Sequence, residues 1–314
     1  MEYTHKPVLL DACIQALNIR PDGVYVDGTL GRAGHSLEIA RRLTTGRLIC
    51  IDRDQAAIDA AKVRLAPYLD RVTLVHSNFS ELKEVLSAAG VSGADGMLFD
   101  LGVSSPQLDD ASRGFSYMQD APLDMRMDTA APLTAYEVVN TWPQEELRRI
   151  LYEYGEERYA PAIAKAIVRA RETAPVKTTL ELVEIIKGAM PPAALREKQH
   201  PAKRSFQAIR IAVNGELDAL SPMLRAAVDG LNPGGRLAVI TFHSLEDRIV
   251  KRTLAELARG CVCPPEFPVC VCGKKPQVRL VTRKPVTAGG AELEENPRAR
   301  SAKLRVAEKC GFDL

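Results

Sequence analysis

Val24–His35, with the sequence Val-Tyr-Val-Asp-Gly-Thr-Leu-Gly-Arg-Ala-Gly-His, is the stretch on which the fold prediction rests. A short apolar run ends in Asp27, and an amphipathic segment begins after His35, so the pattern predicts a strand, a turn and a helix. The turn contains Gly28, Gly31 and Gly34. Glycine lacks a Cβ and accepts positive φ, so this backbone can approach a ligand closely, and the first N–H groups of the helix face the same place. The stretch therefore predicts a pocket for a nucleotide or nucleoside.

A second acidic residue lies one strand further along the chain. Arg47–Ile51 is an apolar run that ends in Asp52. In a βαβ unit that binds a nucleotide, an acidic residue at the end of the second strand holds the ribose hydroxyls. A plain strand–helix turn with an acidic helix cap would also place an acid after a strand. The combination of Asp27 and Asp52 in one βαβ unit favours the nucleotide pocket.

The spacing of the glycines distinguishes between cofactors. The dinucleotide fingerprint Gly-x-Gly-x-x-Gly requires a glycine where this chain has Thr29. Asp27 and Gly31 match the first motif of S-adenosylmethionine-dependent methyltransferases, usually Asp-x-Gly-x-Gly-x-Gly, whereas Thr29 and Ala33 depart from it. The turn therefore favours S-adenosylmethionine over a nicotinamide dinucleotide.

Composition limits the classes of protein that remain. The 314 residues, of which 46% are hydrophobic, suffice for one large domain or two modest ones. A formal net charge of +2 is too small to indicate nucleic-acid binding by itself. No apolar run approaches the roughly 20 residues that span a bilayer, and the first residues lack a signal-peptide pattern. With seven cysteines and no secretory context, we expect reduced thiols and a cytoplasmic location.

The alternation of strand patterns with helix patterns predicts an α/β fold with a parallel, Rossmann-like sheet. Val72–His76 and Gly96–Phe99 are the next strands, and strands alternate with helices up to residue 110. The fifth strand, Arg236–Phe242, follows a turn signal at Asn232–Gly235.

Between the fourth and fifth strands the alternation stops. An irregular loop at 111–130 precedes helices without strands, and two of their starts are predicted from capping boxes. These are Thr141-x-x-Gln144 and Thr178-x-x-Glu181. We therefore expect a discontinuous domain formed by 1–110 and 205–314, and an all-helical insertion at 111–204 that serves substrate recognition.

Polar residues gather where the predicted strands end. Asp100 ends the fourth strand, and Leu101–Asp110 concentrates Gly, Ser, Pro and Asp. Ligands of open α/β sheets bind at this edge, so the loop lies where an acceptor would meet the cofactor. His243, after the fifth strand, is either a site residue or a histidine at the start of a helix that Ser244 caps. Phe79, after the third strand, either stacks on adenine or belongs to the core. The candidate catalytic residues are Asp100, Ser105, Asp109 and His243.

Two further patterns allow two interpretations each. The array Cys261-x-Cys263, six residues, Cys270-x-Cys272 has four thiols that could bind zinc tetrahedrally. Finger motifs space their cysteines as Cys-x₂₋₄-Cys, so reduced thiols on a loop are the alternative. Basic residues occur in local clusters that suit either phosphate contacts or a solvated face. The candidate RNA-binding residues among them are Lys203, Arg204, Arg298, Arg300 and Lys303.

Several strings together resemble one family, the bacterial 16S ribosomal RNA cytosine-N4 methyltransferases of the RsmH/MraW type, over nearly the whole chain. The strings are His5-Lys6-Pro7-Val8-Leu9, Asp27-Gly28-Thr29 with Gly31, Gly34-His35-Ser36, Asp100-Leu101-Gly102-Val103-Ser104-Ser105-Pro106-Gln107, Phe206-Gln207-Ala208-Ile209-Arg210, Phe242-His243-Ser244-Leu245-Glu246-Asp247-Arg248 and Asn296-Pro297-Arg298-Ala299-Arg300-Ser301-Ala302-Lys303. The unusual first motif also matches this family.

The resemblance implies a class I S-adenosylmethionine-dependent methyltransferase fold with a helical insertion. It also implies S-adenosylmethionine as donor and, as acceptor, the exocyclic N4 of a cytidine in the decoding (P-site) region of 16S rRNA in the 30S subunit. The cofactor positions that it carries over are Ala33, Gly34, His35, Asp52, Phe79, Asp100 and Gln107, beside Asp27 and Gly31 of the first motif.

The chemistry of the acceptor sets a requirement for the site. The lone pair of the cytosine amine is delocalised into the ring, and the base must be presented outside any stack. An oxygen that accepts its N–H would localise the lone pair, and alignment would supply much of the acceleration. No cysteine nucleophile is needed. Three alternatives remain at this point: a nicotinamide dehydrogenase, an RNA-binding factor that binds cofactor without turnover, and a DNA cytosine-N4 methyltransferase.

Overall fold

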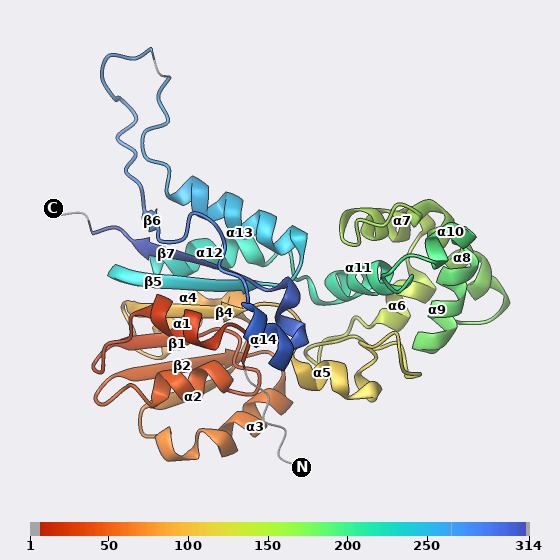
Figure 1. Cartoon of the computed structure of the whole chain (residues 1–314), viewed down its shortest axis with the longest axis horizontal. Helices are drawn as coiled ribbons and strands as arrows, with labels where there is room; N and C mark the ends of the chain where they lie inside the picture. Colours follow the sequence, from red (N-terminus) through yellow and green to blue (C-terminus); the bar gives the residue numbers. More distant parts are fainter. Residues whose placement is uncertain (1–6, 265, 312–314) are drawn as a thin grey trace. The chain divides into compact units, whose positions relative to one another are not determined.

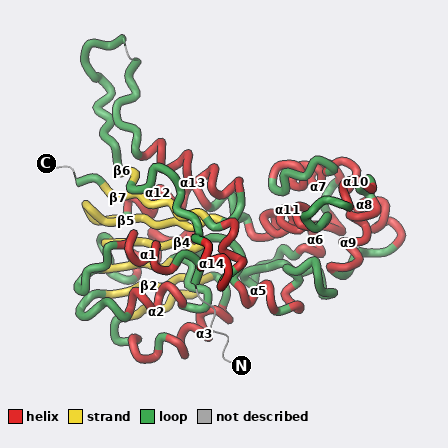
Figure 2. Tube along the Cα trace, viewed as in Figure 1, coloured by secondary structure: helices red, strands yellow, loops and turns green. Residues whose placement is uncertain are grey.

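The computed structural model describes residues 7–264 and 266–311, so His5 lies outside the described residues. The chain divides into two compact units, which Figures 1 and 2 show. The first comprises Met1–Gly102 and Leu217–Leu314, and the second is Val103–Glu216. Within the described residues, no helix combines the length and the apolar character needed to cross a membrane.

The first unit is built on a seven-stranded sheet with the order β3-β2-β1-β4-β5-β7-β6. The strands are β1 Val24–Asp27, β2 Arg47–Asp52, β3 Val72–His76, β4 Ala94–Asp100, β5 Leu231–Thr241, β6 Val278–Leu280 and β7 Lys303–Lys309. Strands β1 to β5 are parallel, whereas β7 runs antiparallel to both β5 and β6. The predicted α/β class and the five predicted strands are confirmed; β6 and β7 are additional.

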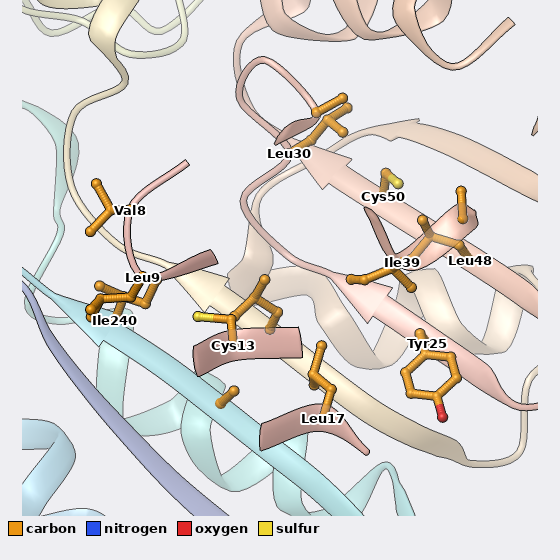
Figure 3. Packing of buried hydrophobic residues seen from close by; sticks show 14 of the residues in the cluster. Val8, Leu9, Cys13, Leu17, Tyr25, Leu30, Ile39, Leu48, Cys50 and Ile240 are labelled. Atoms are coloured by element: carbon orange, nitrogen blue, oxygen red, sulfur yellow. The ribbon is translucent and has the colours of Figure 1, made fainter. Parts of the chain in front are cut away.

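Successive residues of the strands enter two different cores, one on each face of the sheet. Tyr25 and Leu48 pack with residues of α1, α2 and α3, as Figure 3 shows for part of this cluster. Val26 and Ile49, the next residues along, pack with α4, α12 and α13. Burial on both faces explains why these parallel strands are continuously apolar. The helices of this unit are α1 Leu10–Leu17, α2 Gly34–Ala40, α3 Gln55–Arg64, α4 Leu82–Ala88, α12 Leu220–Asp229, α13 Ser244–Leu257 and α14 Gly290–Glu295.

The second unit, all of whose residues are described, has helices around a core of its own and no strand beyond one isolated bridge. Its helices are α5 Ser105–Asp109, α6 Ala135–Thr141, α7 Gln144–Glu153, α8 Ala160–Thr173, α9 Thr179–Gly188, α10 Pro192–Leu195 and α11 Lys203–Asn214. Its limits differ from the expected 111–204. Helix α11 belongs to it because Phe206, Ile209 and Val213 are buried in the helical core, and α5 lies within the segment expected to be a plain loop.

Three local predictions need correction. Thr141 is the last residue of α6 and does not cap α7, whose N-cap is Pro143. The second predicted capping box, between Thr178 and Glu181, is present at the start of α9. The N-cap of α13 is His243 rather than Ser244. Strand β5 begins at Leu231, so the predicted turn at 232–235 is an irregularity within the strand, where the pairing with β4 shifts register.

Candidate active site

The glycine loop after β1 is shaped by close contacts that exclude side chains. A Cβ on Gly28 would lie 2.2 Å from a ring carbon of Phe99, and one on Gly34 would lie 2.3 Å from Cγ of Pro7. Gly31 has a φ of 49°, in the left-handed region that favours glycine. Ala33, also left-handed with a φ of 57°, is fully buried and caps α2. The loop therefore needs its three glycines, as the sequence analysis expected.

Asp27 organises this loop from within. Its Oδ1 accepts the N–H of Thr29 (3.1 Å) and its Oδ2 accepts the hydroxyl of Ser36 (2.6 Å). Burial raises the pKa of Asp27 to about 6, although these hydrogen bonds oppose the rise. Asp27 thus fixes the loop geometry and adds negative charge beneath it.

Thr29 is a site residue that sequence reasoning missed. Its Oγ1 accepts the N–H of Asp100 at 2.5 Å and so ties the glycine loop to the end of β4. The signal was present, because a hydroxyl stands where the dinucleotide fingerprint has glycine. A glycine at this position could not make the bond.

Asp52 joins the loop to the end of β2. Its Oδ2 accepts the N–H of Gly31 (2.7 Å), and its Oδ1 accepts the N–H of Asp54 (2.9 Å). Burial raises its pKa to about 6. Part of Asp52 remains exposed, and each carboxylate oxygen has a second lone pair. Asp52 therefore fits the predicted role of accepting ribose hydroxyls.

Asp100 carries the most unusual ionisation of the site. Burial, followed by the negative charges of Asp27 and Glu246, raises the pKa of Asp100 to about 8. Its Oδ1 is buried with no hydrogen-bond partner among the described residues, while a quarter of the side chain is exposed. This carboxyl lacks the compensation that buried charges normally have.

His35 lies beside Asp100 but does not neutralise it. Its Nδ1 is 3.8 Å from Oδ2 of Asp100, and its Nε2 makes a 3.0 Å hydrogen bond with the carbonyl oxygen of Val8. Burial lowers the pKa of His35 to about 4, so the ring is neutral near pH 7. Near pH 7, Asp27 and Asp52 are largely ionised, because their pKa values are about 6, and they give this edge a negative potential that a cationic ligand would compensate.

His243 and Glu246 lie beyond the neighbouring strand β5. The Nδ1 of His243 accepts the N–H of Glu246, which makes His243 the cap of α13. Oε2 of the buried Glu246 accepts the N–H groups of Phe242 (2.8 Å) and His243 (3.2 Å). His243 is thus a residue at the start of a helix, and its predicted role in the site stays a prediction. Glu246, which raises the pKa of Asp100, was missed; the His-x-x-Glu capping spacing was its signal.

Phe79 lies at the start of a short 3₁₀ turn after β3. Its ring meets that of Phe99 edge-on, with centroids 6.3 Å apart and an interplanar angle of 87°. It is partly buried against the core of the second face. Phe79 thus packs against the core with part of its ring, and the exposed remainder lies at the carboxyl edge of the sheet, so both interpretations stay open.

The other predicted site residues on the loop after β4 belong to the second unit. Ser105 and Asp109 are the first and last residues of α5. The side chain of Gln107 is buried, and its Oε1 accepts the N–H of Ser104 (3.0 Å) in a capping box. Gln107 thus stabilises the start of α5, a role that its position in the sequence did not indicate.

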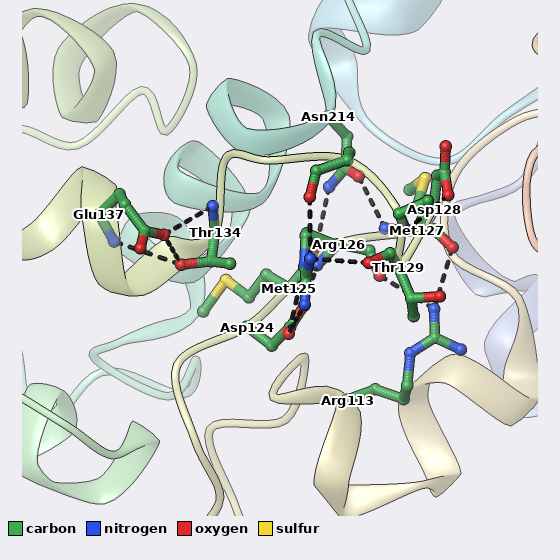
Figure 4. A network of polar contacts seen from close by, with 12 residues as sticks. Arg113, Asp124, Met125, Arg126, Met127, Asp128, Thr129, Thr134, Glu137 and Asn214 are labelled. Atoms are coloured by element: carbon green, nitrogen blue, oxygen red, sulfur yellow. Dashed lines mark hydrogen bonds and ion pairs between the residues drawn. The ribbon is translucent and has the colours of Figure 1, made fainter.

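An irregular segment of the second unit is held by its own polar contacts, which Figure 4 shows. Asp124 accepts two hydrogen bonds from Nε and Nη2 of Arg126, and the Nη1 of Arg126 donates to the carbonyl groups of Thr129 and Ala131. Asn214 of α11 accepts the N–H of Met127 and donates to the carbonyl of Met125. The predicted loop at 111–130 is irregular but firmly held.

The candidate RNA-binding residues differ in exposure. Lys203 and Arg204 are exposed at the start of α11, and Arg298 and Arg300 are exposed on the 3₁₀ turn Pro297–Ser301. Lys303 is less exposed, and its Nζ lies 3.2 Å from Oδ2 of Asp247. Lys303 therefore already pairs with an acidic side chain of the same unit.

A model of the MraW methylase family matches residues 2–310. The chain belongs to the MraW methylase family. It is 58% identical, over 98% of its length and 99% of theirs, to proteins from Brevibacillus brevis and Paenibacillus, each named ribosomal RNA small subunit methyltransferase H. Among solved structures it is similar to an rRNA methylase from Streptococcus thermophilus, with a TM-score of 0.40 and 10% identity over 96% of this chain and 93% of the other.

Membership in this family confirms the predicted resemblance and the class I S-adenosylmethionine-dependent methyltransferase fold. The chain is a methyltransferase with S-adenosylmethionine as its cofactor, which excludes the nicotinamide dehydrogenase alternative. The site fits this cofactor. Its glycine loop leaves room for a close ligand, Asp52 offers an acceptor for ribose hydroxyls, and a cationic sulfonium would favour the ionised forms of Asp27, Asp52 and Asp100.

Proposed function

We propose that this MraW methylase family member methylates the exocyclic N4 of a cytidine in the decoding (P-site) region of 16S rRNA, within the 30S subunit and in the cytoplasm. The relatives named ribosomal RNA small subunit methyltransferase H support the substrate class. The observation that carries the chemistry is Asp100, a partly exposed carboxyl with an unpartnered buried oxygen at the end of β4.

Asp100 is suited to meet the amine of cytosine. A carboxylate that accepts an N–H of the amine localises the nitrogen lone pair, and it can take up the proton that the nitrogen must lose. A proton acceptor works best when its pKa is near the working pH, and the pKa of Asp100 is about 8. Bound S-adenosylmethionine supplies an electrophilic methyl group. Ser105, Asp109 and His243 are further candidates to position the base.

The cofactor would be held mainly by backbone and acids of the first unit. Gly31 and Ala33 would line the turn, the first N–H groups of α2 at Gly34 and His35 would face the cofactor, and Asp52 would accept the ribose hydroxyls. Phe79 at the sheet edge would border the adenine. We retain Gln107 as a further cofactor contact on the basis of the family resemblance.

Exposed basic residues would contact the phosphates of the RNA. Replacing Arg298 and Arg300 with Gln should lower the slope of log affinity against log salt for 16S rRNA by roughly one for each lost contact. Lys303→Gln should change the slope less, because Asp247 already pairs with Lys303. An unchanged slope in the Arg298/Arg300 double variant would remove these two contacts from the proposal.

The deciding experiment is methyl transfer from labelled S-adenosylmethionine to 30S subunits that lack the modification, followed by nucleoside analysis. Label in N4-methylcytidine, located in the decoding region, is the expected result. Cytosine-containing DNA is tested in parallel. Transfer to DNA with none to the subunits would overturn the proposed acceptor, and bound cofactor without any transfer would overturn the proposed reaction.

A further inference from the structure

Between α13 and β6 the chain of the first unit forms a long irregular segment, called the excursion below, that carries four cysteines. Figure 1 shows this segment leaving the end of α13 and returning to β6. The Sγ atoms of Cys261, Cys263, Cys270 and Cys272 all lie within 4.8 Å of one another. The Cys270–Cys272 separation is 3.6 Å and the Cys261–Cys272 separation is 3.7 Å. Residues that are far apart along the excursion are therefore brought together in pairs at one point.

These separations fit the edges of a metal tetrahedron. Zinc–sulfur bonds of about 2.3 Å place the four sulfur atoms of a tetrahedral site about 3.8 Å apart. A disulfide would bring two sulfur atoms to about 2.0 Å, and all four cysteines are free thiols. Two of the separations match the edge of a zinc–thiolate tetrahedron, and the whole set is compact enough for one ion.

Backbone N–H groups point at three of the sulfur atoms. Val262 donates to Cys272, Cys263 donates to Cys261, and Val271 donates to Cys263, each at 3.4 Å. Two of these bonds connect the two Cys-x-Cys arms with each other. Such donors stabilise thiolates, the form in which cysteine binds metal.

Little else holds this excursion. The N–H of Gln277 donates to the carbonyl of Leu257 (2.8 Å) and so connects the two ends of the excursion. Between them, the described residues 259–264 and 266–277 form neither helix nor strand. Its large apolar side chains are 45–73% exposed, so they supply no core. They are Val262, Phe267, Val269 and Val271. A segment of this kind needs a cross-link to keep one conformation.

We propose that Cys261, Cys263, Cys270 and Cys272 bind one zinc ion as a closed, four-thiolate structural site. Four protein ligands leave no open position for water or substrate, so the ion orders the excursion and takes no part in catalysis. On binding, each cysteine still protonated releases its proton to solvent as its sulfur–zinc bond forms. The inference does not depend on the proposed methyl transfer.

Metal content provides the first test. The full chain, purified under reducing conditions and dialysed against zinc and then buffer, should retain about one zinc per chain, released when a mercurial blocks the thiols. Cys263→Ser and Cys270→Ser should each weaken zinc binding by at least tenfold against a chromophoric chelator. Cys310→Ser, a change at a free cysteine outside the cluster, is the matched control and should retain zinc.

Several results would overturn the proposal. These are a chain without zinc after this treatment, iron in place of zinc, or equal zinc affinity in Cys270→Ser and Cys310→Ser. Limited proteolysis gives an independent readout of order. Zinc should slow cleavage within 262–276 by roughly tenfold or more, and cleavage that ignores zinc and chelator would contradict a structural role.

Discussion

Asp100, at the carboxyl edge of the sheet, and Asp124, in the helical unit, are both partly withdrawn from water, yet their pKa values shift in opposite directions. Burial raises the pKa of Asp27, Asp52 and Asp100, which contact N–H groups, a hydroxyl and a neutral imidazole. Burial also acts on Asp124, but the guanidinium of Arg126 outweighs it and lowers the pKa. Asp124 thus has a cationic partner within its own unit, whereas among the described residues no arginine or lysine contact accompanies the raised pKa of Asp100.

This difference teaches how to separate stabilising charges from functional ones. A carboxylate paired with arginine contributes to folding, and its loss is a loss of stability. A carboxylate that lacks a cation costs folding free energy when it ionises, and only a bound cation compensates.

Asp100→Asn should lower kcat/KM for methyl transfer by roughly 100-fold, because it removes the charge and the proton acceptor while keeping the shape. Measured affinity for S-adenosylmethionine separates the two roles. Retained affinity with lost kcat supports proton acceptance, and lost affinity with retained kcat makes Asp100 a charge for the cofactor only. Asp59→Asn, an exposed acid on α3, is the control. Activity within a few-fold of the parent would exclude both roles.

Asp124→Asn should destabilise the second unit by about 2 kcal/mol at pH 7, because it removes a bidentate, half-buried pair with Arg126. Unfolding by urea, followed by the fluorescence of Trp142, reports on this unit. The folded-state pKa of Asp124 is lowered, so its contribution is present above about pH 4 and is lost as the pH falls through the lowered value. An effect that persists at pH 2 would contradict a charge-based cause.

Asp100→Asn should act in the opposite direction and stabilise the unliganded chain by about 1–2 kcal/mol at pH 8 to 9. The pKa of Asp100 is raised to about 8, so the stability it contributes when protonated is lost as the pH rises from about 4 towards 8. The partial exposure of the side chain reduces the effect. Thermal unfolding at pH 9 measures the effect. Stability equal to or lower than that of the parent would contradict the claim that ionised Asp100 destabilises the unliganded chain.

Affinity for S-adenosylmethionine relative to S-adenosylhomocysteine should increase by about tenfold between pH 5.5 and 8.5. The two ligands share their amino group and differ in the sulfonium charge, which ionised acids favour. Since the pKa values of Asp27 and Asp52 are about 6 and that of Asp100 is about 8, the preference should grow over this interval. Titration calorimetry across the range measures it. A flat ratio would show that the acids do not face the sulfonium.

Glu145→Gln should change the stability of the second unit by less than about 0.5 kcal/mol. Glu145 pairs with Arg148 at 2.8 Å on α7, but both side chains are more than half exposed. The same Trp142 measurement serves for this variant and for Asp124→Asn. A loss as large as that of Asp124→Asn would mean that pairing itself, rather than withdrawal from water, sets the energy.

Much of the first unit could be predicted because its signals are local. Apolar runs marked all five parallel strands, three of which end in an acid, and the glycine turn was recognised from spacing alone. The short strands β6 and β7 were missed, since antiparallel pairing at residues far along the chain has no local period. The helical insertion was recognised, but its limits were misplaced because α11 is amphipathic whichever core receives it.

The candidate site likewise contains residues that the sequence identified and residues that it did not. Residue type and position at strand ends identified Asp27, Asp52 and Asp100. Thr29 and Glu246 were missed, because their parts depend on atoms that only folding brings near: the N–H of Asp100 in one case and the N–H groups of Phe242 and His243 in the other.

The sequence by itself therefore determined the strand–turn–helix unit, the identity of the acids at the sheet edge and the family, because glycines, apolar period and strand-end residues act over a few neighbouring positions. Tertiary structure alone decided how those acids ionise, which basic residues are already paired, and that two distant Cys-x-Cys arms meet at one point. Burial, electrostatic fields and ligand geometry are sums over residues that become neighbours only when the chain folds.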